Sequence, residues 1–436
     1  MTGAIVLIVY VTIFVLSLLI VGWLTRRFFE KADFTSLKTV TFGDESAVRA
    51  NRVASVLSVL AIFALWVAFT NSSLKLPQAK GPYDGPVTFN YTSTLENGDS
   101  DEATVTILVH REDLQLEKDE DGNPLRPPPK PEVEEGDGFA KNDSLVVPRY
   151  GSKVINVFKN DEFGKADGAK ITHYNGDPIN PGEQIKLSEG RLALTPKGGV
   201  FFEPATGFRM ARLYLPAPEV TSNRFLELNA EGYRNFTLLE HTWASLKRVL
   251  LGFFYGALAG IPLGYAMGLT NWARGWFDPI VEFMRPVPPL ALIPLMIIWF
   301  GIGEQSKIIL LFLAALWIMA IAARSGVSGV AIAKVHAAYS LGASKWQILR
   351  KVIIPNSLPE IFTGARVAMG VCWGTVVAAE LVAAEKGLGM MIMVASKFQL
   401  TDIVIVGIIL IGIIGFLIDI CIRFLESWLV PWKGKV

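Results

Sequence analysis

Seven runs of apolar residues, most of them as long as a bilayer-spanning helix, constrain this chain more than any other feature. They cover residues 1–24, 53–70, 249–269, 288–301, 306–323, 361–384 and 403–422. Apolar residues make up 51% of the 436, and they are concentrated in these runs. Because a backbone in hydrocarbon must satisfy its hydrogen bonds internally, the runs are expected to be helices. The sequence predicts an α-helical membrane protein with about seven transmembrane helices.

Basic residues orient these predicted helices. No positive charge precedes the first run, Arg26 and Arg27 follow it, and the segment up to Arg52 is basic, which indicates an uncleaved span followed by a cytoplasmic loop. Counting crossings then places the basic segment 334–351 and the C-terminal tail in the cytoplasm as well. The run 288–301 is short and holds three prolines, so we expect it to face protein rather than lipid.

Residues 71–229 differ from the rest, because they are polar and carry short alternating segments typical of strands. Asn97-Gly98 lies between two such segments and predicts a hairpin. We expect an all-β sandwich outside the membrane, with an acidic, proline-rich linker at 112–138. The predicted domains are therefore 1–70, two helices and a loop; 71–229, the sandwich; and 230–436, a helical core.

The sandwich sequence resembles a cadherin-like or Ig-like repeat. Residues 154–164 and 171–208 are similar to the opening and middle of such a repeat, and residues 89–109 to its closing strands, which here come first. The resemblance implies a circularly permuted domain, whose linker runs from one end to the other and whose two ends lie near the membrane. Asn160-Asp161 allows a calcium site, but an Asx turn is the better interpretation without a clustered acidic set.

The segment 334–355 is basic yet sits between two apolar runs. Its apolar residues recur at near-helical spacing, which predicts a helix-turn-helix on the cytoplasmic surface. Ala337 and Ala338 permit close approach of a partner, Gly342 ends the first helix, and Pro355 begins the next span. Composition alone leaves two interpretations open: a docking surface for a protein, or an amphipathic helix held by anionic membrane lipid.

The spacing within this segment resembles the EAA loop of ABC importer permeases. His336-Ala337-Ala338, Gly342, and the group Val352, Ile354 and Pro355 match that loop in spacing, with histidine in place of the usual glutamate. The resemblance implies a coupling helix that binds an ABC ATPase subunit, with these contact residues: His336, Ala337, Ala338, Leu341, Gly342, Ala343 and Pro355.

The sequence on both sides of this segment resembles a smaller group within the ABC importer permeases. Residues 245–268, 285–307 and 364–392 are similar to permeases for taurine, aliphatic sulfonates, nitrate and bicarbonate. The resemblance implies a type I ABC importer permease core in the bacterial inner membrane. Its implied partners are a periplasmic substrate-binding protein, a second permease copy and a small anionic substrate.

Polar and small residues inside the predicted spans suggest further roles. Arg366 and Glu380 lie fourteen residues apart and share a helix face, so they are candidates to line or gate a transport path; a structural ion pair at the membrane edge is the alternative. Trp299, Trp317 and Trp373 are candidates for lining or for packing. A glycine every fourth residue from 252 to 264 predicts close helix packing, either within the chain or at a dimer interface.

Catalysis and nucleic-acid binding have no support in the sequence. No G-x-x-x-x-G-K-[ST] phosphate loop occurs, and the four histidines and two cysteines suggest no catalytic set, metal site or cofactor. We therefore predict a permease subunit, not an enzyme, energised by a separate ATPase. The alternative is a membrane-anchored surface-binding or sensor protein in which the sandwich carries the function; five spans after the sandwich argue against it.

Overall fold

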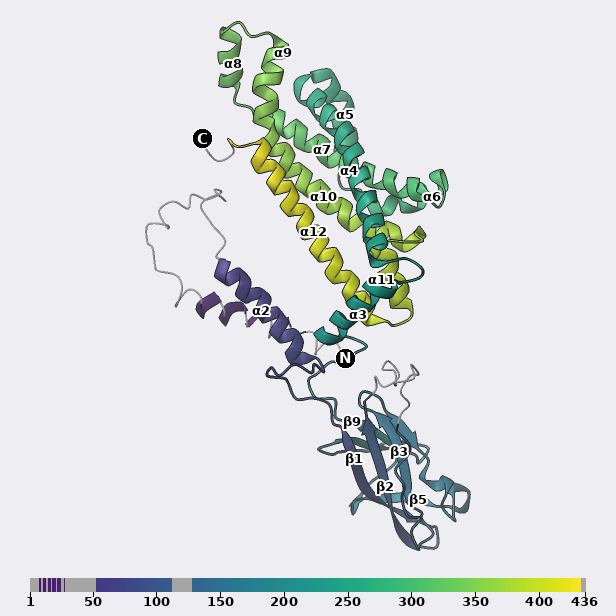
Figure 1. Cartoon of the computed structure of the whole chain (residues 1–436). Helices are drawn as coiled ribbons and strands as arrows, with labels where there is room; N and C mark the ends of the chain where they lie inside the picture. The colour runs from purple at the N-terminus through teal and green to yellow at the C-terminus, as the bar shows by residue number, and fades with distance from the viewer. Residues whose placement is uncertain are drawn as a thin grey trace. The chain divides into compact units, whose positions relative to one another are not determined.

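The computed structural model describes residues 52–111 and 128–432, with scattered residues between 8 and 27 (Figure 1). Most of the predicted first span, the loop after it, much of the proline-rich linker and the last four residues lie outside this description. The chain forms two compact units, Met1–Asp33 with Ala50–Pro218, and Phe34–Arg49 with Glu219–Val436. The second unit thus begins earlier than the predicted boundary at residue 229.

The first unit contains one described long helix and two sheets. Helix α2 (Arg52–Phe69) matches the predicted run 53–70. The first sheet has the order β3-β2-β1-β5-β6, formed by Asp143–Pro148, Ser100–His110, Gly85–Thr94, Lys170–Tyr174 and Asp177–Pro178. The second has the order β4-β9-β8-β7, formed by Lys153–Ile155, Val200–Pro204, Gly190–Leu194 and Gln184–Lys186. Two short 3-10 helices, Val157–Lys159 and Lys165–Asp167, connect strands.

One hydrophobic core joins the two sheets. Phe89 and Ile107 of the first sheet and Leu192 and Phe202 of the second are at most 2% exposed and belong to the same cluster. Alternate residues of β1 and β2 point into this core, as their period-two sequence predicts. The unit is therefore a β-sandwich.

The order of the strands requires a long return connection. Strands β1 and β2 form the antiparallel hairpin predicted at Asn97-Gly98, where Gly98 has φ 93°. Strand β2 pairs with β3 in parallel, from Val105↔Asp143 to His110↔Pro148. Because parallel neighbours run in the same direction, the end of β2 and the start of β3 lie toward opposite ends of the sheet. The circularly permuted order stays a prediction.

Both ends of the sandwich meet at the end of α2. The amide of Met210 donates to the Phe69 carbonyl at 2.9 Å, and the amide of Ala79 donates to the Ala68 carbonyl at 2.8 Å. The Trp66 indole donates to the Pro216 carbonyl at 2.9 Å. The sandwich therefore leaves and rejoins the chain at one place, as expected for a domain inserted between helices.

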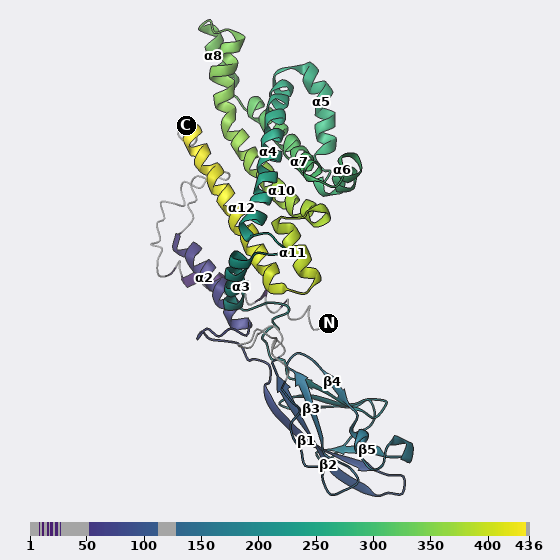
Figure 2. The ribbon, with the colours of Figure 1, turned by 45° about the vertical axis from the view of Figure 1, so that its right-hand side comes forward.

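The second unit is helical. Its helices are α3 (Pro218–Glu231), α4 (Leu238–Leu269), α5 (Asn271–Met284), the 3-10 turn η5 (Pro289–Leu292), α6 (Ile293–Phe300), α7 (Glu304–Ser328), α8 (Ile332–Ser340), α9 (Lys345–Ile348), the π-helix η6 (Leu349–Ile353), α10 (Ile354–Ala383), α11 (Leu388–Lys397) and α12 (Thr401–Leu429). Helices α4, α7, α10 and α12 lie along one another in both views (Figure 1 and Figure 2).

Among the described residues, four helices are long and apolar enough to cross a membrane. They are α4, α7, the helical run Lys345–Leu381 and α12. Helix α5 and the segment Pro289–Phe300 pass the same test only together, and they are bent by 91°. The predicted span 288–301 thus consists of η5 and α6. Helix α6 has eight residues and is about 12 Å long, too short to cross about 30 Å of hydrocarbon alone.

The regularly spaced glycines bring α4 against α7. Gly252, Gly256, Gly260 and Gly264 are all buried. A Cβ atom at Gly256 would lie 2.5 Å from the Ala315 Cβ, closer than atoms in contact can approach. The glycine face of α4 is therefore covered within the chain by α7, and the dimer-interface alternative for it is wrong.

Candidate functional site

The segment 332–348, here named the coupling tip, is a short helix, a turn and a second short helix. Gly342 ends α8 with φ 81°, its amide donates to the Tyr339 carbonyl at 2.9 Å, and the amide of Ala343 donates to the Ala338 carbonyl at 3.1 Å. These two bonds form a Schellman motif, which requires a left-handed residue at this position. Ser344 then caps α9. The predicted helix-turn-helix and the role of Gly342 in ending its first helix are confirmed.

Apolar side chains on the coupling tip are exposed. Leu341 is 88% exposed, Tyr339 70% and Trp346 66%. His336 and Ala337 are exposed as well, Ala338 and Ala343 are half-buried, and a Cβ atom at Gly342 would meet nothing within 4 Å. Three large apolar groups on one protruding element are typical of an interaction surface.

The coupling tip continues into α10 without a break. Helix α9, the π-helix η6 and α10 form one helical run from Lys345 to Leu381, about 55 Å long at 1.5 Å per residue. Pro355 is the second residue of α10 and directly follows η6, so inside this continuous run its missing amide hydrogen leaves one carbonyl of the preceding turn without its helix bond. The tip is therefore joined to the far end of α10 by a single helix.

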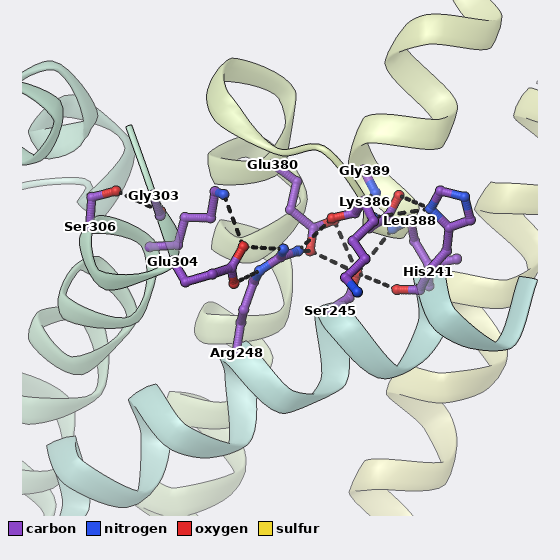
Figure 3. Close-up of polar contacts among 12 residues, drawn as sticks. His241, Ser245, Arg248, Gly303, Glu304, Ser306, Glu380, Lys386, Leu388 and Gly389 are labelled. Atoms are coloured by element: carbon purple, nitrogen blue, oxygen red, sulfur yellow. Dashed lines mark hydrogen bonds and ion pairs between the residues drawn. The ribbon is translucent and has the colours of Figure 1, made fainter. Parts of the chain in front are cut away.

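A group of charged residues, here named the Arg248 network, lies at that far end (Figure 3). Arg248 of α4 is 2% exposed, and its Nη1 donates to Glu380 Oε1 of α10 at 2.6 Å. Its Nε and Nη2 donate to the two carboxylate oxygens of Glu304, the first residue of α7, both at 2.6 Å. Lys307 Nζ lies 3.4 Å from Glu304 Oε1. The four charges therefore alternate in sign.

The Glu380 carboxylate is fixed by hydrogen bonds from α4 and α11. Its side chain is fully buried, and it accepts from the Ser245 hydroxyl at 2.8 and 3.0 Å and from the Gly389 amide at 2.9 Å. Gly387 has φ 144°, and a Cβ atom there would lie 2.4 Å from the Glu380 carboxyl carbon. The turn between α10 and α11 thus wraps around this carboxylate.

His241 holds the same turn. Its Nδ1 accepts from the Gly387 amide at 3.1 Å, and its Nε2 lies 3.0 Å from the Tyr233 carbonyl, so the hydrogen belongs on Nε2. The Ser245 hydroxyl, one turn along α4, accepts from the Leu388 amide at 3.0 Å. Successive turns of α4 therefore fix the backbone that surrounds Glu380.

A cavity of about 720 Å³ opens beside the network. Arg248, Glu304 and Lys307 line it, whereas Glu380 does not. The rest of its wall combines apolar residues with charged ones: Trp243, Ala244, Leu251, Ile302, Gly303 and Ile308, and Glu240, Lys247, Glu385 and Lys386. Its volume lies within the range of about 300–1,000 Å³ that small-molecule sites occupy.

Arg366 and Glu380, predicted to share a face of one helix, contact different partners. Arg366 Nη2 lies 3.7 Å from Glu426 Oε2 of α12, whereas Glu380 pairs with Arg248 of α4. Trp373 is 8% exposed, and its indole donates to the Ile411 carbonyl of α12 at 3.0 Å. Arg366 and Trp373 line a separate cavity of about 150 Å³. The structure therefore separates Glu380 from the other two residues.

The sequence analysis missed Arg248, Glu304 and Lys307. Arg248 immediately precedes the apolar run that begins at residue 249 and so lies outside the predicted span, although α4 begins ten residues earlier at Leu238. Glu304 precedes the predicted run 306–323, and Lys307 is the second residue of that run. No spacing within one helix signals the pairing of Arg248 with Glu380, because the two residues lie on α4 and α10.

The Asn160-Asp161 pair serves the sandwich backbone. Asp161 Oδ1 accepts from the Lys141 amide at 2.8 Å, so it ties two distant segments together and does not close a local Asx turn. Asp143 nearby is 8% exposed. Burial, together with the carboxylate of Asp161, raises the pKa of Asp143 to about 7.

Known transport proteins share the sequence of the helical unit. Residues 256–431 match the family described as the binding-protein-dependent transport system inner membrane component. A taurine transport system permease protein of Escherichia coli is 47% identical over 254 residues, which are 58% of this chain and 92% of that protein. A nitrate import permease protein of Synechocystis is 35% identical over 193 residues, which are 44% of this chain and 70% of that protein.

These matches agree with a structure whose long apolar helices carry a protruding, exposed tip between α7 and α10. The chain therefore belongs to the binding-protein-dependent transport system inner membrane component family, as a multi-pass permease subunit of an ABC transporter that is not itself an enzyme.

Proposed function

We propose that this permease imports a small anion, most of all taurine or another aliphatic sulfonate, in an ATP-driven complex. The observation that carries the proposal is the 47% identity to a taurine transport system permease over 92% of its length. Nitrate is the second candidate, because a nitrate import permease is 35% identical over a shorter stretch. A substrate-binding protein delivers the anion, and a separate ATPase supplies the energy.

Coupling to the ATPase occurs at the coupling tip. The exposed Leu341, Tyr339 and Trp346 supply the apolar surface that a protein groove covers. His336, Ala337, Ala338, Gly342 and Ala343 shape that surface, and Pro355 begins the helix that carries the motion inward. The proposal takes the docking interpretation of the tip over the one in which membrane lipid holds it.

Two permease copies form the transport path between them, in the membrane of a bacterial cell. On α10, Arg366 and Trp373 line a cavity against α12, and Glu380 acts on the path through Arg248, which it anchors. We expect the basic coupling tip to lie in the cytoplasm and the sandwich in the periplasm, on the side from which the binding protein approaches; the positive charge of the tip supports this orientation.

Uptake in proteoliposomes tests the substrate. The permease, its ATPase and its binding protein are reconstituted with ATP on the ATPase side, and labelled taurine is followed. We expect ATP-dependent accumulation that unlabelled methanesulfonate competes against more strongly than nitrate. Accumulation of neither taurine nor nitrate would overturn the proposal.

Leu341→Ser tests docking. This leucine is 88% exposed, so its loss leaves the permease fold intact while removing an apolar anchor from the interface. We expect the variant to reach the membrane but to lose co-purification with the ATPase. Leu239→Ser, at a 77% exposed leucine in the first turn of α4, is the matched control and should retain the ATPase. Equal retention by both variants would exclude the tip as the docking surface.

A further inference from the structure

One edge of the Arg248 guanidinium is anchored to the protein. Its Nη1 donates to Glu380 Oε1 at 2.6 Å and to the Lys386 carbonyl at 2.9 Å. Since Glu380 is itself held by Ser245 and the Gly389 amide, this edge is fixed in position. Fixing one edge orients the other edge as well, because a guanidinium is planar.

The other edge, formed by Nε and Nη2, binds a carboxylate in a bidentate manner. Both bonds to Glu304 measure 2.6 Å (Figure 3). This is the geometry in which arginine recognises planar or trigonal oxyanions in general. Glu304 therefore occupies a position that a carboxylate, sulfonate or nitrate group fits equally well.

Glu304 is held much less firmly than Glu380. Its side chain is 59% exposed, whereas that of Glu380 is fully buried. It follows a loop with glycine at 301 and 303, and Gly301 has φ 74°, a conformation that glycine adopts at little cost. The cavity of about 720 Å³ lies on the side of Glu304. A change in this loop can withdraw the Glu304 carboxylate without disturbing the anchored edge.

The formal charges of the Arg248 network determine the charge of an anion that could replace Glu304. The network holds two cations, Arg248 and Lys307, and two carboxylates, Glu304 and Glu380, so its formal charge is zero. Withdrawal of Glu304 leaves a charge of +1, which one monovalent anion neutralises. The first turn of α7, whose Gly303 cap has no side chain to bind the free amides, adds favourable potential for an anion.

We propose that the Nε and Nη2 edge of Arg248, with Lys307, is a binding subsite for a small monovalent oxyanion, and that Glu304 is an internal occupant which the anion displaces. The proposal rests on the proposed function and names the residues that receive its substrate. The apolar Leu251 and Ile302 in the cavity wall suit a short alkyl chain such as that of a sulfonate.

Binding of methanesulfonate to the purified permease–ATPase complex, without the binding protein, tests this proposal. The melting temperature is followed against methanesulfonate concentration at constant ionic strength, with chloride as the replaced ion. Glu304→Gln keeps the shape of the occupant but removes its charge, so it competes less well for Arg248. We expect the variant to bind methanesulfonate about tenfold more tightly than the wild type.

Glu385→Gln is the matched control, because it removes the same charge from the same cavity wall and, among the described residues, makes no ion pair with Arg248. Its affinity should stay within about twofold of the wild type, since an exposed charge is screened. Arg248→Lys should abolish the saturable shift, because lysine lacks the bidentate edge. If this variant fails to assemble, the pair Glu304→Gln and Glu385→Gln decides alone.

Equal affinities of the two glutamine variants would overturn the subsite. That result combined with taurine uptake by the wild type overturns the subsite and leaves the proposed function standing. Absence of uptake overturns the function, whichever way the variants bind methanesulfonate.

Discussion

At the scale of single residues, the buried ion pair of Arg248 and Glu380 is the feature of the helical unit whose loss we expect to cost the most stability. Glu380→Gln removes one charge from a pair in which both side chains are at most 2% exposed, and leaves Arg248 short of a counter-charge. Removing one partner of a buried ion pair costs about 3–5 kcal/mol. We expect a strongly lowered melting temperature of the purified complex.

The control for this variant is Glu282→Gln, at a half-exposed residue paired with Arg324, where we expect a loss below about 1 kcal/mol. Uptake measured on the same samples separates the two roles of Glu380. Normal ATP-dependent uptake at a lowered melting temperature would make Glu380 a structural residue and remove it from the transport path.

Asp143 gives the sandwich a pH dependence. Its pKa is about 7 in the folded domain, against about 3.9 in an unfolded chain. Between these values the folded state binds more protons, so the free energy of unfolding falls as pH rises from about 4 to about 7. Asp143→Asn should flatten this decline and stabilise the domain at pH 8.

Urea unfolding of residues 70–217, which contain the hydrophobic core of the sandwich, measures this effect at pH 5 and pH 8. Asp177→Asn, at an exposed aspartate of β6, is the control and should keep the wild-type slope. A slope in Asp143→Asn equal to that of the wild type would contradict the assignment.

At the scale of elements, the contact between α4 and α7 depends on glycine. Gly256→Ala would place a methyl group 2.5 Å from the Ala315 Cβ, so the helices must move apart. Overpacking of this kind costs about 1–3 kcal/mol. Gly374→Ala on α10, where a Cβ atom meets nothing within 4 Å, should be neutral or slightly stabilising. Melting temperatures compare the two, and an equal response would refute the packing argument.

Structural elements were predicted correctly from the sequence where a single local pattern of residues determines the backbone conformation. The hairpin at Asn97-Gly98 and the turn at Gly342 follow from local chemistry, and both are present. The α5 helix was missed because Arg274, Asp278 and Glu282 interrupt its apolar residues, although Arg324 pairs with the two acids. The partner of Glu380 was missed for a related reason: pairing between helices depends on their packing, which no spacing within one helix determines.

At the scale of the whole molecule, we propose that the sandwich is a separable insertion. Both of its ends meet at the end of α2, so residues 80–208 can be replaced by a short flexible linker without stretching the chain. We expect the shortened permease to assemble with its ATPase. Productive docking of the binding protein should weaken, seen as a raised half-saturating concentration of that protein in the uptake assay, since a sandwich face can supply about 800 Å² to an interface.

The full-length permease, which keeps the sandwich and carries the same linker in its C-terminal tail, serves as the control for handling and expression. Unchanged docking and uptake would reduce the sandwich to a spacer. Failure to assemble would mean that the domain is part of the permease fold.

The unbroken helix from Lys345 to Leu381 has a thermodynamic consequence for the complex. It joins the surface on which we propose that an ATPase docks to the carboxylate that anchors Arg248, so a movement that one ligand favours would be transmitted to the other end. Free energies of binding are reciprocal: if the ATPase in its ATP-bound state changes the affinity for the anion by some factor, the anion changes the affinity for that state by the same factor. The affinity for methanesulfonate, measured with and without a non-hydrolysable ATP analogue, therefore gives the coupling free energy between nucleotide binding and anion binding at Arg248.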